Sequence, residues 1–191
     1  MPSRVSAIGP DSPVASTPAA EAQALYAAAC KAWAEGKREA AVAWLDDALR
    51  LRPDFAEALA MGGYMLGESG YAEAALRLYR RARALNPSLI VAHLNAGKLL
   101  FSLGRFDEAL AAFETAAELA PDDADAWSSR AGALRELGRL EESLAAARRA
   151  FALKPDMPEA AINLAHAVLY LCLAPKSNTV IASLGRATDA V

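Results

Sequence analysis

The residues that could perform acid–base, nucleophilic or metal chemistry are few in this chain. It has two histidines, His93 and His166, separated by 73 residues, and two cysteines, Cys30 and Cys172, near opposite ends. Neither pair has the short spacing of a metal site or a redox dithiol. The sequence also has no phosphate-binding glycine loop and no paired catalytic carboxylates. We therefore predict no catalytic residue, no metal site and no cofactor, and we expect the protein not to be an enzyme.

The overall charge and hydropathy exclude further classes of function. A net charge of -3 is too small to indicate a nucleic-acid-binding protein. The longest apolar run, in residues 161–174, is interrupted by Asn163 and His166 and is short for a membrane span. Residues 1–20 are rich in proline, serine and alanine, lack the apolar core of a secretion signal and predict a disordered leader. We expect a cytoplasmic protein with reduced thiols.

The sequence repeats with a period of 34 residues. Glycine and proline mark this period at Gly36, Gly70, Gly104, Gly138, Pro53, Pro87, Pro121 and Pro155. A fixed period with the same residue character in each column is the sequence signature of a repeat architecture.

Each repeat predicts a hairpin of two helices. In the third repeat, apolar residues follow helical steps of three and four in 94–101 and again in 106–117. Gly104 is suited to end the first helix, because glycine enters the left-handed cap conformation at little cost. Pro121 disfavours helical geometry in the residue before it and is suited to end the second helix. One hairpin cannot bury its apolar face alone, so we expect neighbouring hairpins to stack.

Charged residues of the second helices also follow the period. Their sign alternates from repeat to repeat, at Asp46 and Asp47, Arg80 and Arg81, Glu114, then Arg148 and Arg149. We expect cross-repeat ion pairs along this face, with an ordinary solvated face as the equal alternative.

These residues resemble the tetratricopeptide repeat (TPR) family. The family pattern is a large residue, two small ones, a large one, and then a small–aromatic–small–proline series. The third repeat supplies it in register with His93, Ala96, Gly97, Leu100, Ala109, Phe113, Ala116 and Pro121. Arg130 and Ala147 depart from the pattern in the fourth repeat, and we expect them to loosen its packing.

The resemblance implies an all-α fold, a right-handed α-solenoid of stacked TPR hairpins. The expected organisation is a leader over 1–20, four repeats over 21–157 and a degenerate fifth repeat or capping helices over 158–191. The boundaries of the four repeats are predicted at about 22–55, 56–89, 90–123 and 124–157.

The resemblance also implies a concave groove lined by the first helix of each repeat. Such a groove binds an extended peptide or a partner helix. The groove residues that we single out as partner contacts are Met61, Tyr64, Asn95, Lys98, Asn163 and His166. Co-chaperones of the family hold a terminal carboxylate with lysine, asparagine and arginine, and this sequence lacks the basic members of that set in either possible frame. Carboxylate clamping is therefore not expected.

Two functional hypotheses remain from the sequence. The first is a stand-alone scaffold for protein–protein interaction. The second is the N-terminal targeting module of a larger enzyme, such as an O-GlcNAc-type glycosyltransferase, which a reading frame continuing past Val191 would favour. The apolar segment 160–174 must be covered on one side. We expect a helix over 175–191 to fold back onto it, or a homo-oligomer to form through it.

Overall fold

The computed structural model describes residues 17–173, and within them every regular element is a helix. Their bounds are α1 Pro18–Ala34, α2 Arg38–Leu51, α3 Ala56–Glu68, α4 Ala72–Leu85, α5 Ile90–Ser102, α6 Phe106–Leu119, α7 Ala124–Glu136, α8 Leu140–Leu153 and α9 Pro158–Leu173. The chain divides into two compact units, Met1–Pro87 and Ser88–Val191, which are described separately.

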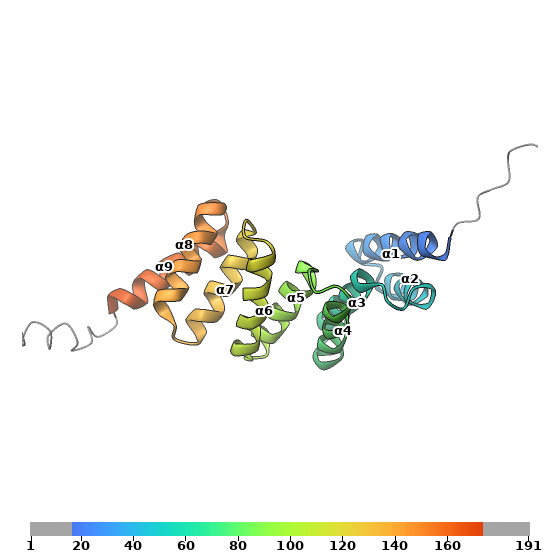
Figure 1. The fold of residues 1–191 in the computed structure, drawn as a ribbon, viewed down its shortest axis with the longest axis horizontal. Coiled ribbons are helices and arrows are strands. Elements are labelled where there is room, and N and C mark those ends of the chain that lie inside the picture. Colours follow the sequence, from blue (N-terminus) through green and yellow to red (C-terminus); the bar gives the residue numbers. More distant parts are fainter. Residues whose placement is uncertain (1–16, 174–191) are drawn as a thin grey trace, which may run out of the picture. The chain divides into compact units, whose positions relative to one another are not determined.

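The Met1–Pro87 unit contains two helical hairpins, α1–α2 and α3–α4 (Figure 1). Alanines such as Ala29 and Ala41 are fully buried, so the helix backbones approach closely. Larger side chains fill the remaining space around Leu45 and Phe55, and the ring of Tyr26 packs against that of Phe55 at a centroid distance of 5.0 Å. The apolar stripes predicted from the sequence are thus the faces along which these helices pack.

The Ser88–Val191 unit contains the hairpins α5–α6 and α7–α8, followed by α9. Helix α7 packs against α6 from the preceding hairpin, and α9 packs against both α7 and α8 (Figure 1). The first helix of each successive repeat therefore lies beside the next one, with α7 between α5 and α9. This order brings side chains from three repeats to a common surface.

Glycine ends the first helix of every hairpin, as predicted. Gly36, Gly70, Gly104 and Gly138 all have positive φ angles, between 72° and 85°. After α5, the amide of Arg105 donates to the carbonyl of Leu100 at 2.9 Å, and the amide of Gly104 donates to Phe101 at 3.0 Å. This is the bonding pattern of the Schellman motif, and it satisfies carbonyls that the helix end leaves unpaired. The second helices end two residues before each period-marking proline.

A glycine faces an aromatic ring inside two of the hairpins. A Cβ atom added to Gly63 would lie 2.9 Å from the ring of Tyr79, and one added to Gly97 would lie 2.5 Å from the ring of Phe113. Both rings are almost completely buried. The ring on the second helix therefore occupies the space that the missing side chain leaves on the first helix.

The fourth repeat replaces this pair with Ala131 and Ala147, both fully buried. Arg130, the other departure from the pattern, makes polar contacts through its Nη2 atom, while its Nε atom is buried without a hydrogen-bond partner among the described residues. Its guanidinium lies 3.4 Å from the carboxylate of Glu114 and 5.4 Å from the ring centroid of Trp127. Arginine at this position thus ties α7 to α6.

The charged face of the second helices pairs differently from the predicted ladder. Asp47 pairs with Arg50 of its own helix at 2.8 Å. Arg81 donates to the backbone carbonyl of Pro53 at 2.7 Å. Arg149 makes the corresponding bond to Pro121 and also an ion pair with Asp122 of the preceding repeat, both at 3.4 Å. The reason is local: a carbonyl beside a helix end has no helical partner and accepts a nearby guanidinium.

Both ends of the described region differ in detail from the expected boundaries. Helix α1 begins at Pro18, and the hydroxyl of Thr17 accepts from the amide of Ala20, so residues 18–20 are helical rather than part of a leader. At the other end, α9 keeps large apolar side chains exposed, with Leu169 and Leu173 at 54% and 72%. The helix expected over 175–191 lies outside the described residues, and self-association through α9 stays a prediction.

Candidate functional site

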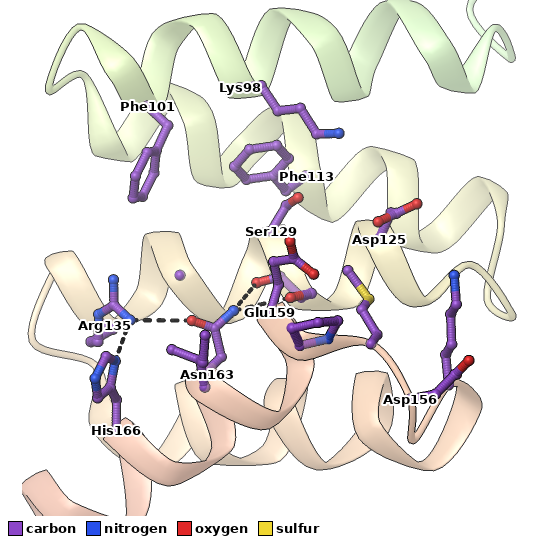
Figure 2. A pocket seen from close by; sticks show the side chains of 16 residues that line it. Lys98, Phe101, Phe113, Asp125, Ser129, Arg135, Asp156, Glu159, Asn163 and His166 are labelled. Atoms are coloured by element: carbon purple, nitrogen blue, oxygen red, sulfur yellow. Dashed lines mark hydrogen bonds between the residues drawn. The ribbon is translucent and has the colours of Figure 1, made fainter.

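A cavity with a volume of about 750 Å³ lies in the Ser88–Val191 unit. It is lined mainly by α5, α7 and α9, the first helices of three successive repeats (Figure 2). The side chains on which the following argument depends are Lys98, Phe101, Asp125, Ser129, Arg135, Glu159, Ile162, Asn163 and His166.

Helix α7 provides the floor of the cavity. Asp125, Ser129, Gly132 and Arg135 follow one another at steps of three or four and therefore share one face of the helix. Along this face the helix presents a carboxylate, a hydroxyl, a position with no side chain and a guanidinium. A Cβ atom added at Gly132 would meet only the edge of Phe101, at 3.9 Å.

Arg135 connects α7 to α9 at one end of the cavity. Its Nη1 donates to the Oδ1 atom of Asn163 at 3.1 Å and lies 3.1 Å from Nδ1 of His166 (Figure 2). The other side of the guanidinium donates to Glu136 through Nη2 at 2.9 Å and Nε at 3.1 Å. Because Nη1 can only donate, the contact is a hydrogen bond when Nδ1 of His166 carries no proton.

Asn163 closes this network on the side of α7. Its Nδ2 donates to the carbonyl and to the hydroxyl of Ser128, both at 3.0 Å, while its Oδ1 accepts from Arg135. Ser128 is buried, so these bonds satisfy polar groups that water does not reach. The side chain of Asn163 therefore fixes α9 on α7, and both ends of its amide are occupied.

Lys98 stands on the opposite wall of the cavity, on α5 (Figure 2). It is exposed and, among the described residues, forms no ion pair. Asp125 and Glu159 lie in the first turns of α7 and α9, where the helix dipole favours acidic side chains. The cavity thus carries charges of both signs around an apolar part made by Phe101 and Ile162.

The six predicted partner contacts fall in the two units. Lys98, Asn163 and His166 line the cavity, whereas Asn95 is half-buried on α5 and does not line it.

Met61 and Tyr64 lie on α3, in the Met1–Pro87 unit. Met61 packs against the apolar core of that unit, and Tyr64 is 38% exposed with its ring at 6.1 Å from that of Trp33.

Sequence reasoning missed Arg135 and Phe101, which occupy one column of the repeat together with Trp33 and Gly67. The sequence did contain an indication, because arginine is rarely found at a packed position and Arg135 shares its column with two aromatic residues.

No group of three or more potential metal ligands comes together among residues 17–173. Over the same residues, the helices are too short or too polar for any of them to cross a bilayer.

Stacked antiparallel hairpins with a 34-residue period define a helical-repeat protein, and comparison with known families identifies which one. Two models of the tetratricopeptide repeat match, at residues 22–55 and 94–167, and together span more than half of the chain. The chain belongs to the tetratricopeptide repeat family, which confirms the resemblance and the all-α, helical-repeat class of fold.

Solved structures agree with this assignment. A double mutant of MamA from strain RS-1 is similar with a TM-score of 0.71 and 22% identity, covering 90% of this chain and 98% of that one. PilF of Pseudomonas aeruginosa is similar with a TM-score of 0.73 and 19% identity, covering 78% and 68%. The first TPR domain of Spaghetti (RPAP3), bound to the HSP90 peptide SRMEEVD, gives a TM-score of 0.59 and 26% identity, covering 61% and 93%. No curated protein matches the sequence significantly.

Proposed function

We propose that this protein is a non-catalytic interaction scaffold whose Ser88–Val191 unit binds an extended peptide or a partner helix in the cavity between α5, α7 and α9. The observation that carries the proposal is the cavity itself, which receives side chains from the first helices of three successive repeats. Its volume of about 750 Å³ falls in the range of ligand-binding pockets. Convergence of three repeats on one cavity suits a partner that runs across them.

The comparison with the Spaghetti domain supports a peptide as the class of partner, because that TPR domain is bound to one. The way of holding it must differ here. In the three repeats that line the cavity, the columns of the clamp hold Leu94, Lys98, Ser129, Glu159 and Asn163, so the set contains one basic residue together with an acidic one. We therefore propose recognition through internal side chains of the peptide rather than through its terminal carboxylate.

Within the cavity, Lys98 and His166 are the proposed direct contacts. Lys98 has no ion-pair partner among the described residues and is free to pair with an acidic side chain of the peptide. Asn163 contributes by holding α9 in place. Tyr64 offers a rigid, partly exposed ring in the other unit and is proposed as a separate contact. Cys30 and Cys172 are free thiols, which suits a reducing compartment such as the cytoplasm.

The test is selection of binding peptides from a random library displayed on phage, followed by affinity measurement on synthetic copies. Lys98→Glu should weaken binding of the selected peptides by about tenfold or more, because it replaces an attraction by a repulsion. Arg148→Glu is the matched control, since it reverses the same charge on α8, where Arg148 is exposed and does not line the cavity.

Equal losses in the two variants would show only a nonspecific charge effect and would count against the cavity. Failure to select any peptide, with the folded state verified by circular dichroism, would contradict peptide binding by this unit.

A further inference from the structure

Gly132 differs from the glycines that face aromatic rings. At Gly97 an added Cβ atom would collide with the ring of Phe113, so close packing explains the glycine. At Gly132 the nearest side-chain atom is Cε2 of Phe101, at 3.9 Å, which is ordinary contact distance. Packing inside the molecule therefore gives no reason for the absence of a side chain at this position.

Backbone geometry gives no reason either. Gly132 lies in the interior of α7, and its φ angle is not positive, unlike those of the four glycines that end helices. Glycine in the middle of a helix is destabilising relative to alanine, because it loses more backbone entropy on folding. A residue that costs stability and serves neither packing nor a turn is expected to serve a site.

The space in front of Gly132 is the cavity, since Gly132 is one of the residues that line it. The wall beside it is apolar and rigid. The ring of Phe101 packs edge-on against that of Phe106 at 5.2 Å, which limits its rotation. Phe113, almost completely buried, and Ile162, 52% exposed, line the same cavity from α6 and α9.

We propose that the gap at Gly132 is a subsite that receives one bulky apolar side chain, aromatic or branched aliphatic, of the bound peptide. This inference rests on the proposed function and specifies its ligand. Polar groups flank the subsite along α7, with Ser129 one turn before and Arg135 one turn after, and Lys98 lines the cavity from α5. The ligand is thus a polar peptide segment with an acidic residue next to a single large apolar anchor.

The proposal first predicts the effect of filling the gap on stability. Gly132→Ala should raise the melting temperature by about 1–4 °C, because alanine favours the helix and its methyl group has room. A lower melting temperature would mean that the glycine is needed for folding and would overturn the proposal.

Binding is then tested by NMR on the full-length ¹⁵N-labelled chain, with N-acetyl-L-phenylalanine amide and N-acetyl-L-asparagine amide as probes. The phenylalanine probe should shift the amide signals of Gly132 and Phe101 more than the asparagine probe does. In Gly132→Leu the apparent affinity for the phenylalanine probe should fall by about tenfold, because the leucine side chain occupies the subsite. Ala145→Leu is the matched control, since it adds the same side chain on the exposed surface of α8, away from the cavity.

Equal binding of the phenylalanine probe by wild type and Gly132→Leu would overturn the subsite. The peptides selected on phage separate this failure from failure of the proposed function. If they bind wild type and Gly132→Leu equally but lose affinity with Lys98→Glu, the cavity binds peptides and the subsite is wrong. If they lose affinity in Gly132→Leu and carry a common large apolar residue, both proposals are supported.

Discussion

Replacing Gly97 by alanine should destabilise the protein, although the same change at most helix positions stabilises it. The added Cβ atom would lie 2.5, 2.8 and 3.0 Å from three carbon atoms of the Phe113 ring. That ring is 1% exposed, so no neighbouring space allows it to move aside without displacing other buried atoms. The substitution therefore forces either the ring or the helix out of its place.

The magnitude follows from two opposing contributions. Overpacking of a filled core typically costs about 1–3 kcal/mol, and a contact of 2.5 Å against a buried ring favours the upper part of that range. Alanine in place of glycine in a helix returns about 0.5–1 kcal/mol. We expect Gly97→Ala to lower the free energy of unfolding by about 1–2 kcal/mol.

The assay is urea unfolding of the full chain followed by far-ultraviolet circular dichroism, with hydrogen exchange locating the loss in α5 and α6. Gly132→Ala is the matched control, because it makes the same chemical change where the Cβ atom meets nothing closer than 3.9 Å, and it should be stabilising. Adding Phe113→Leu to Gly97→Ala should recover part of the loss, since the smaller side chain relieves the overlap. A Gly97→Ala variant as stable as wild type would refute the reasoning.

Three further predictions concern other contacts. Asn163→Ala should accelerate hydrogen exchange in α9 and cost about 1–3 kcal/mol, because the buried hydroxyl of Ser128 loses its donor and the Nη1 atom of Arg135 loses an acceptor. Burial raises the pKa of Tyr26 to about 12. The protonated phenol therefore contributes fully to stability below about pH 10, and this contribution is lost as the pH rises towards 12. Between about pH 9 and 11 the melting temperature of Tyr26→Phe should fall less than that of the wild type. Arg149→Ala should cost less than about 1 kcal/mol, and high salt should reduce the difference from wild type, because its ion pair with Asp122 is exposed and screened by salt.

The sequence was sufficient to predict the helical hairpins because their signals are local. A positive φ angle at Gly104 and the end of α6 before Pro121 depend on one residue and its neighbours. The same holds for the acidic first turn of α6. A fixed period then extends these local predictions along the chain, so an error in one repeat is corrected by the others.

The contacts of the cavity could not be predicted in the same way. The bond between Arg135 and Asn163 joins residues 28 positions apart, and its existence depends on how closely α9 approaches α7. The period identified Lys98 and His166 as groove residues, and it also suggested Met61, which is partly buried against the core of the other unit. Alternating charge along the second helices likewise could not reveal that Arg81 bonds to a backbone carbonyl. Which side chains become partners depends on distances of a few ångströms, and the residue types in one column of the repeat give no information about those distances.

The pairing of a glycine with a ring lies inside one hairpin in both places where it occurs, Gly63 with Tyr79 and Gly97 with Phe113. The two members of each pair therefore stay together whenever a whole hairpin is duplicated or deleted. A chimaera that exchanges whole hairpins keeps each ring with its own glycine. A chimaera that joins α3 to α6 in a single hairpin would instead place Gly63 opposite Phe113, which is again a glycine opposite an aromatic ring. A graft of α7 onto α6 would set the methyl group of Ala131 against Phe113. The natural unit for engineering this array is the hairpin, and the two helices of a hairpin should be mutated together.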